Sequence, residues 1–400
     1  MERGKRVLIY SHDTYGLGHL RRSLLIAEGL TAAPGFRSVL VATGSPRAQA
    51  FRLPQGCDTL KLPAVTKTVA GGYRSRTLRM PIDDLARLRA EMLRSVARSF
   101  RPDVILVDHA PAGMHGELRP LFDELRRWPR RPRLVLGLRD VIDDARRVRD
   151  QWDRVGAWHL LDELYDRVLV YGDPSVPSTA DELGLRSRIP GKVTAVGYLG
   201  RTIPRCPDPA DPFVLVTTGG GGDGHALLRS YLSYLERLPA RAGFRSVLVS
   251  GPFLSSRRER EVAARARDVD QPVEMLPFTD RFEGLLGRAT GVVSMAGYNT
   301  VMEVLSAGVP ALLVPREAPR LEQRIRAERL ARVADVEWAP AERLDDRRIG
   351  RFVDRVMAGW PRASATLDMG GVARTVAELR AVVEDAAAAR EGRTRAPAIA

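Results

Sequence analysis

The sequence predicts an α/β protein built from two successive doubly wound domains. Short, continuously apolar runs alternate with longer amphipathic stretches along its 400 residues. Continuous apolar runs indicate strands that are buried on both faces, which is typical of parallel sheets covered by helices. A proline-rich segment interrupts the alternation, and the same rhythm restarts after it. A chain of this length also favours two domains of roughly 150–200 residues each.

The first part of the chain, residues 1–198, predicts a Rossmann-like domain. Its apolar runs predict strands at residues 6–10, 38–42, 104–107, 134–138 and 167–170. Amphipathic segments at 20–29 and 81–100 predict helices, and in the second one Leu85, Leu88, Met92 and Val96 recur every three or four residues. Strands and helices that alternate in this way predict βαβ units.

A linker and a second Rossmann-like domain are predicted to follow. Four prolines between residues 199 and 212 exclude a helix or a central strand there. Strands are predicted again at 213–216, 246–250, 273–276, 291–294 and 311–314, with a first helix at 226–238. We therefore predict a second domain over residues 213–370. A helix at 371–389 is expected to pack back on the first domain, and the tail at 390–400 is expected to be disordered.

Composition narrows the class of protein. The chain is 44% hydrophobic and 28% charged, and no apolar run approaches the roughly 18–20 residues that cross a bilayer. Cys57 and Cys206 form no CxxC pattern and the six histidines show no HExxH spacing, so no metal site is predicted. The net charge, 63 − 49 = +14, comes without any nucleic-acid-binding motif, so no nucleic-acid partner is predicted. We expect a cytoplasmic protein, with peripheral contact to the inner face of the membrane as a further option.

A glycine run after the first strand of the second domain predicts a phosphate-binding loop. Gly219, Gly220, Gly221 and Gly222 are followed by Asp223 and by the predicted helix. In an open α/β sheet, ligands bind beyond the carboxyl ends of the strands. Glycines there let backbone N–H groups approach an anion, and the helix N-terminus adds partial positive charge. The alternative is a flexible turn, although four adjacent glycines are entropically costly in a mere connector.

The first domain has a matching turn after its first strand. Asp13 precedes Gly16 and Gly18, whose flexibility suits a tight turn, and His19 then stands at the start of the next helix. A neutral histidine in that place can take a proton from an attacking hydroxyl. The alternative is a polar surface or capping histidine.

The segment after residue 294 combines a turn, a helix start and an acid. Ser294 ends a strand, Gly297 makes the turn, and a helix is predicted to begin near Asn299. Glu303 lies three residues after Thr300, which is the spacing of a capping box. The functional alternative is that the Glu303 carboxylate binds the two hydroxyls of a ribose, because both of its oxygens accept hydrogen bonds.

A second pair of polar residues follows the last predicted strand. A helix is predicted to start after Pro319, with Glu322 and Gln323 in its first turn. A carboxylate there is favoured by the helix dipole alone. The functional alternative is that both side chains bind sugar hydroxyls.

These segments resemble the MurG-like glycosyltransferases of family 28. Over residues 276–330 the resemblance to that family's C-terminal domain rests on Gly297, Thr300, Glu303, Gly308, Pro310, Pro315 and Gln323. The run at 219–222 resembles the family's second glycine loop, and the turn from Gly16 to His19 resembles its first. That first loop lacks the Gly-Gly-Thr-Gly-Gly-His form of MurG. With Arg139-Asp140 and the segment 108–117, the pattern is closer to a bacterial group of predicted glycosyltransferases.

The resemblance implies a GT-B fold, in which two Rossmann-like domains face a central cleft. It implies that Glu303 binds ribose, and that Glu322 and Gln323 hold the sugar. It implies a base site near Phe278 and Thr279, and a diphosphate site lined by the residues from Gly219 to Asp223 with Ser294 and Gly297. Such enzymes work without metal or cofactor, so Arg139 or Arg320 is expected to help stabilise the leaving diphosphate.

The sequence therefore predicts a hexosyltransferase that uses a nucleotide sugar. UDP-N-acetylglucosamine is the first expected donor, by resemblance, and the acceptor is a glycan, a lipid-linked molecule or a small molecule. His19 is the expected base. Two alternatives stay open: a UDP-sugar 2-epimerase of similar architecture, which His12, Asp13 and His225 would serve, and a non-catalytic sugar-nucleotide-binding subunit.

Overall fold

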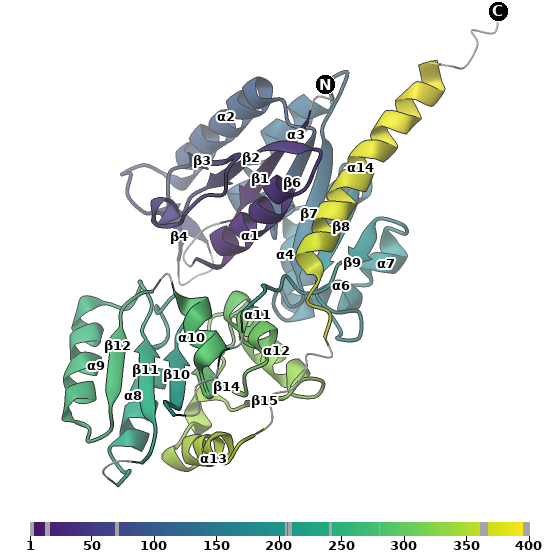
Figure 1. The fold of residues 1–400 in the computed structure, drawn as a ribbon. Coiled ribbons are helices and arrows are strands. Elements are labelled where there is room, and N and C mark those ends of the chain that lie inside the picture. The colour runs from purple at the N-terminus through teal and green to yellow at the C-terminus, as the bar shows by residue number, and fades with distance from the viewer. Residues whose placement is uncertain are drawn as a thin grey trace, which may run out of the picture. The chain divides into compact units, whose positions relative to one another are not determined.

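The computed structural model describes residues 4–12, 17–68, 72–204, 206, 210–239, 242–279, 281–360 and 367–394, with side chains of the last helix described up to residue 386. The chain forms two compact units (Figure 1). Unit 1 comprises residues 1–172, 178–197 and 370–400, and unit 2 comprises residues 173–177 and 198–369.

The described part of unit 1 contains a parallel sheet of seven strands in the order β3-β2-β1-β6-β7-β8-β9. The strands are β1 (Lys5–Ser11), β2 (Phe36–Thr43), β3 (Cys57–Lys61), β6 (Val104–Asp108), β7 (Arg133–Arg139), β8 (Arg167–Tyr171) and β9 (Val193–Ala195). Central strands β1 and β6 are apolar and almost fully buried, as both-face coverage requires. An antiparallel hairpin joins β4 (Val65–Lys67) to β5 (Tyr73–Ser75).

Helices cover this sheet, and one of them buries a charge. The helices are α1 (Gly18–Ala32), α2 (Ile82–Phe100), α3 (Arg119–Leu125), α4 (Ala145–Arg154), α5 (Ala157–Glu163), α6 (Thr179–Glu182) and α7 (Leu185–Arg188), with 3₁₀ turns η1 (Ala48–Ala50) and η2 (Met114–Gly116). On α2 the predicted apolar residue Leu88 is 41% exposed, whereas Arg89 is buried. Arg89 Nε donates to Glu117 Oε2 at 2.6 Å and Arg89 Nη2 donates to Glu117 Oε1 at 2.7 Å. Tyr10 Oη donates to the same carboxylate at 2.7 Å. Because its charge is paired, Arg89 and not Leu88 lies on the buried face of α2.

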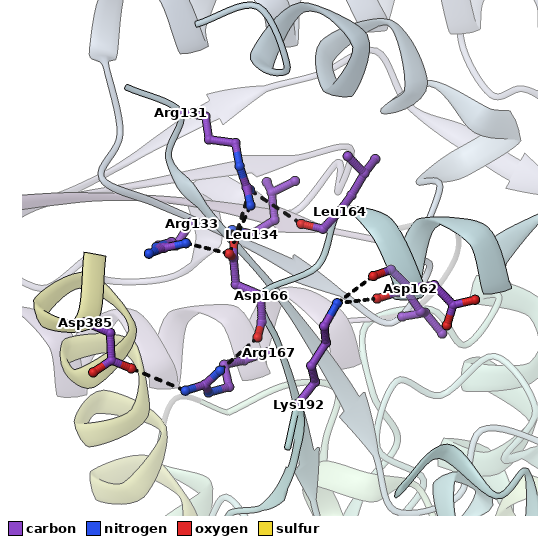
Figure 2. A network of polar contacts seen from close by, with 10 residues as sticks. Arg131, Arg133, Leu134, Asp162, Leu164, Asp166, Arg167, Lys192 and Asp385 are labelled. Carbon is purple, nitrogen blue, oxygen red and sulfur yellow. Dashed lines mark hydrogen bonds and ion pairs between the residues drawn. The ribbon is translucent and has the colours of Figure 1, made fainter. Parts of the chain in front are cut away.

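The last helix, α14 (Gly371–Thr394), belongs to unit 1 and packs beside α1 (Figure 1). The two helices are so close that a Cβ at Gly29 would lie 2.5 Å from Val372 Cγ1. Figure 2 shows Asp385 of α14 paired with Arg167, with 3.3 Å between Nη2 and Oδ2. The predicted start of the disordered tail, residue 390, is wrong, because the helix runs to Thr394. Residues 395–400 lie outside the described part.

The arginine-rich segment before β7 is partly neutralised. Arg131 and Arg133 both pair with Asp166 at 3.0 and 2.8 Å, and the same carboxylate accepts from the Leu134 backbone N–H at 2.8 Å (Figure 2). These two cations therefore tie the starts of β7 and β8 together.

The described part of unit 2 contains a six-stranded parallel sheet in the order β12-β11-β10-β13-β14-β15. Its strands are β10 (Phe213–Thr217), β11 (Arg245–Val249), β12 (Val273–Leu276), β13 (Gly291–Ser294), β14 (Ala311–Leu313) and β15 (Val336–Trp338). Its helices are α8 (His225–Leu235), α9 (Ser256–Asp268), α10 (Phe282–Arg288), α11 (Tyr298–Ala307), α12 (Glu322–Leu330) and α13 (Asp346–Met357), with a 3₁₀ turn η3 (Ala341–Arg343).

The unit boundaries differ from the predicted domains at two places. Residues 173–177 belong to unit 2, and so does the proline-rich segment at 199–212. Hydrogen bonds give the reason: the Asp368 N–H donates to Asp173 Oδ2 at 2.6 Å, and the Tyr198 N–H donates to the Asp368 carbonyl at 2.7 Å. The edge strands β3, β9 and β15 were not predicted, because they lack a continuous apolar run.

In each sheet the strand order reverses at one point, and this reversal indicates where a ligand can bind. In unit 1 the strand order reverses between β1 and β6, and in unit 2 it reverses between β10 and β13. Loops that leave the two central strands in opposite directions open a crevice at the carboxyl edge, where α/β proteins bind ligands. The glycine run follows β10, and the segment from Ser294 to Gly297 ends β13 and leads into α11.

Candidate active site

In unit 2 the glycine run lies between the loop after β11 and the first turn of α11. The Phe253 N–H donates to the Gly220 carbonyl at 2.9 Å, and the Thr218 hydroxyl donates to the Ser250 carbonyl at 2.6 Å. On the other side, a Cβ at Gly219 would lie 3.3 Å from Thr300 Oγ1. Loop and helix N-terminus are therefore adjacent at the crevice between β10 and β13.

The glycines of this run differ in burial and in what surrounds them. Gly221 is buried with φ of +90°, and a Cβ there would overlap the Ser250 carbonyl oxygen and lie 2.9 Å from the Gly251 carbonyl oxygen. Gly221 is thus required by packing between two loops. Gly219, Gly220 and Gly222 remain half-buried, so their backbone groups are the ones a ligand can approach.

Of the two alternatives for Glu303, the structure excludes the capping box with Thr300. Helix α11 begins at Tyr298 with Gly297 as its N-cap, so Glu303 lies beyond the first turn. Glu303 is 3% exposed, and its Oε1 lies 3.8 Å from Arg201 Nε. Arg201 itself pairs with Glu283 at 3.2 Å. Glu303 is therefore a buried carboxylate beside a cation, and helix capping does not explain its place.

The start of α11 is open around Gly297. This residue has φ of −67°, and a Cβ built on it would meet nothing within 4 Å. Ser294, at the end of β13, is fully buried, and its hydroxyl has no hydrogen-bond partner within the described residues. The first N–H groups of a helix lack intrahelical acceptors, so this end is suited to an anion.

Arg316 joins the glycine run to the start of α12. Arg316 Nη2 donates to Glu322 Oε1 at 2.6 Å, and its backbone N–H donates to Gln323 Oε1 at 3.2 Å. Arg316 Nε lies 3.6 Å from Asp223 Oδ2. Glu322 and Gln323, the first two residues of α12, are both buried. The predicted sugar-binding pair and the predicted phosphate loop are thus linked by one arginine.

Four other residues predicted for the donor site are exposed or half-buried. Phe278 follows β12, an outer strand, and is 47% exposed; Thr279 Oγ1 accepts from the Arg281 N–H at 3.0 Å. Asn299 and Arg320 are half-buried, in the first turn of α11 and just before α12. Their roles in binding a base or a diphosphate stay predictions.

In unit 1 the predicted base His19 is bound to an aspartate. His19 is the second residue of α1, and its Nδ1 lies 2.6 Å from Asp108 Oδ2 at the end of β6. Arg22, one turn further along α1, donates from Nε and Nη2 to Asp108 Oδ1 at 3.0 and 2.7 Å. The carboxylate 2.6 Å from Nδ1 favours a proton on that nitrogen, although Arg22 Nη2 also lies 3.0 Å from it; this tautomer leaves Nε2 as the acceptor.

The electrostatics keep His19 neutral and Asp108 ionised. Burial lowers the pKa of His19 to about 4, although the charge of Asp108 opposes this, and the positive charges of Arg22 and Arg139 lower it further. The pKa of Asp108 lies well below its usual range, because the charge of Arg22 and the hydrogen bonds from His19 and Arg22 outweigh the effect of burial. At neutral pH the imidazole can therefore accept a proton, with Asp108 beside it to stabilise the resulting imidazolium.

Two more histidines surround His19. The ring centroid of His12, after β1, lies 5.6 Å from that of His19, and the ring of His109, after β6, lies 5.2 Å away. His109 has φ of +73°, an uncommon conformation that clusters at functional sites. Tyr73 Oη lies 3.3 Å from His12 Nε2. Within the described residues, no group of three or more histidine, cysteine or acidic side chains is placed to hold a metal ion.

Not every residue predicted for the first loop can be placed. Asp13 and Gly16 lie outside the described residues. Gly18 is the first residue of α1, so it does not form the turn that its flexibility suggested. Arg139 ends β7, close enough to His19 to affect its pKa.

Sequence reasoning missed the partners of these residues. Asp108 directly follows the apolar run of β6, so the rule that located the glycine run could also have located this carboxylate. Arg22 is three residues after His19, on the same face of α1. Arg201 carried no local signal, because its partners Glu283 and Glu303 are distant in sequence. The approach of Arg316 to Asp223 likewise joins distant segments.

Comparison with known proteins assigns the family. The model of the glycosyltransferase family 28 C-terminal domain matches residues 214–363, which lie within unit 2. The chain is 30% identical over 319 residues to the UDP-N-acetylglucosamine–N-acetylmuramyl-(pentapeptide) pyrophosphoryl-undecaprenol N-acetylglucosamine transferase of Mycobacterium bovis (strain BCG / Pasteur 1173P2). That match covers 78% of this chain and 71% of the relative. The chain belongs to glycosyltransferase family 28. It is therefore a glycosyltransferase, as the resemblance implied.

Solved structures show that this family 28 chain has the GT-B fold. The crystal structure of Acinetobacter baumannii MurG matches with a TM-score of 0.54 and 15% identity, over 96% of this chain and 99% of that one. A UDP-GlcNAc 2-epimerase from Methanocaldococcus jannaschii matches with a TM-score of 0.61 and 12% identity, over 94% and 99%. At such identities the likeness shows the fold alone, so the epimerase match adds nothing to the epimerase alternative. Among the described residues of this glycosyltransferase, no helix is long and apolar enough to cross a bilayer.

Proposed function

We propose that this glycosyltransferase moves a hexose, with N-acetylglucosamine as the first candidate, from a UDP-linked donor to an acceptor hydroxyl without metal or cofactor. The name of the Mycobacterium bovis relative supports UDP-N-acetylglucosamine as donor. The acceptor hydroxyl belongs to a glycan, a lipid-linked molecule or a small molecule, and the protein works in the cytoplasm or peripherally at the membrane.

The observation that carries the proposal is the meeting of the glycine run with the open start of α11. Half-buried backbone groups at Gly219 and Gly220 adjoin a helix N-terminus, with nothing within 4 Å of a Cβ at Gly297. Such a site suits a diphosphate, because glycines let an anion approach the backbone and the dipole at a helix N-terminus favours negative charge. Ribose would bind Glu303 in the same helix, and the sugar would bind Glu322 and Gln323.

His19 is the proposed base. Its Nε2 would take the proton of the acceptor hydroxyl, while Asp108 holds the Nδ1 proton and balances the charge that forms. A positioned base of this kind contributes about 10²–10⁴-fold to the rate.

Nucleotide binding tests the proposal most directly. Thermal unfolding is followed with UDP, UDP-N-acetylglucosamine, ADP and TDP. A ligand at 100 times its Kd stabilises the folded protein by about 2.7 kcal/mol. We expect the largest shift with the uridine nucleotides and a smaller one after Glu303→Ala. The matched control is Glu274→Ala, an exposed acid on β12 of the same unit, which should bind as the wild type does.

Three outcomes would overturn the proposal. Absence of a shift with every nucleoside diphosphate would remove the donor site. Conversion of UDP-N-acetylglucosamine to its 2-epimer in the absence of acceptor would instead favour the epimerase. If His19→Ala and Glu303→Ala left every activity of a complex with a membrane partner intact, the non-catalytic sugar-nucleotide-binding subunit would be the better account.

A further inference from the structure

Arg316 stands between the two halves of the donor site in unit 2. Its guanidinium touches Glu322 on one side, at the start of α12, and faces Asp223 on the other, in the loop after β10. The backbone of Arg316 is fixed as well, since its N–H donates to Gln323 Oε1 at 3.2 Å. The side chain is 24% exposed, so a ligand in the crevice can reach it.

The two acidic contacts of Arg316 differ in strength. The distance from Nη2 to Glu322 Oε1 is 2.6 Å, which is a charge-assisted hydrogen bond to a side chain that is only 4% exposed. The distance from Nε to Asp223 Oδ2 is 3.6 Å, longer than a hydrogen bond, and the Asp223 side chain is 51% exposed. Glu322 therefore fixes the guanidinium, while Asp223 is a weak and replaceable counter-ion.

The arginine also keeps hydrogen-bonding capacity. Within the described residues, Nη1 of Arg316 makes no hydrogen bond, and Nε makes only the long approach to Asp223. A guanidinium presents its donors in a planar fork that matches two oxygens of a phosphate. The Nε–H group points toward Asp223, which directly follows the glycine run, and the two Nη1 protons lie on the other side of the guanidinium.

We propose that Arg316 is a catalytic residue that binds the diphosphate of the donor and stabilises it as the leaving group. This inference rests on the proposed function, in which the glycine run holds the diphosphate and α12 holds the sugar. Asp223 gives up its place beside Arg316 when the diphosphate enters. Arg316 then supplies the cation that chemistry without metal requires.

The role of the charge follows from the transfer step. The acceptor oxygen forms a bond to the anomeric carbon of the sugar, and the bond from that carbon to the oxygen of the β-phosphate breaks. The electron pair of the broken bond stays on the diphosphate, and the acceptor proton goes to His19. Negative charge thus grows on the diphosphate, where a fixed guanidinium stabilises it more in the transition state than in the ground state.

Comparison of UDP with UMP tests this assignment by isothermal titration. Arg316→Gln should raise the Kd for UDP about 10- to 100-fold, as expected for loss of a hydrogen bond to a charged group, and leave the Kd for UMP within about twofold. Retained UMP binding also proves that unit 2 is folded. Arg324→Gln is the control, because this arginine of α12 is 45% exposed and, within the described residues, pairs only with Glu317 and Glu328.

A second variant tests the exchange without touching the arginine. Asp223→Asn removes the competing carboxylate, so UDP should bind about two- to fivefold more tightly, the size of an exposed ion pair. Equal weakening of UDP and UMP by Arg316→Gln, or no weakening of either, would overturn the role of Arg316. Unchanged or weaker UDP binding by Asp223→Asn would overturn the exchange. If the wild type bound neither nucleotide, the proposed function itself would fail.

Discussion

Two glycine-to-alanine changes in unit 2 should have opposite effects, because one glycine faces protein and the other faces open space. At Gly297, φ is −67° and an added Cβ meets nothing within 4 Å. At Gly221, φ is +90° and an added Cβ would overlap the Ser250 carbonyl oxygen. An alanine methyl group at Gly297 therefore tests ligand binding, whereas one at Gly221 tests packing.

The magnitudes follow from these surroundings. Gly297→Ala should change stability by less than about 1 kcal/mol, because the smaller unfolded-state entropy of alanine offsets its poorer N-capping. Its methyl group would keep an anion from the first N–H groups of α11. Loss of one hydrogen bond to a charged ligand costs about 1.5–3 kcal/mol, or roughly 10- to 150-fold in the Kd for UDP. Gly221→Ala should destabilise unit 2 by about 2 kcal/mol or more, through backbone strain and overlap.

Urea denaturation without ligand and titration with UDP measure both quantities for both variants. The expected result is a stable Gly297→Ala protein that binds UDP weakly, and a destabilised Gly221→Ala protein. Wild-type affinity of Gly297→Ala for UDP would refute the reasoning, because the open start of α11 would then hold no part of the nucleotide. A large loss of stability in Gly297→Ala would also refute it, since nothing in the structure occupies that space.

Two further predictions concern unit 1. Glu117→Ala leaves Arg89 buried without its counter-ion and should lower the free energy of unfolding in urea by about 3–5 kcal/mol. Glu124→Gln breaks partly exposed ion pairs and should lower it by less than about 1 kcal/mol. Similar losses in the two variants would contradict the buried pair. The pKa of His19 is about 4 in the folded protein and 6.5 when unperturbed, so between these values the unfolded chain binds more protons and stability falls as the pH drops. From pH 6.5 to 4 this loss amounts to about 3 kcal/mol relative to His19→Gln, and parallel pH profiles of the two proteins would show that the His19 pKa is not lowered.

The sequence by itself determined the architecture and the position of the loops. Continuous apolar runs mark the central strands, because a strand covered on both faces buries most of its side chains. The glycine run, Gly297 and Glu322 could be placed at strand ends and helix starts, because turns and helix termini depend on a few adjacent residues. The edge strands escaped notice because they are short and only partly buried, so their residues carry no continuous apolar pattern.

Only the tertiary structure decided which of these residues act together. His19 and Asp108 are 89 residues apart and meet because β1 and β6 are neighbours in the sheet. Arg316 meets Asp223 because the loops after β14 and β10 reach the same crevice. The capping alternative for Glu303 is excluded because the helix starts at Tyr298, two residues before Thr300, with Gly297 as its N-cap. Local patterns depend on neighbours in the chain, whereas charge pairing depends on strand order, which brings distant residues within a few ångströms.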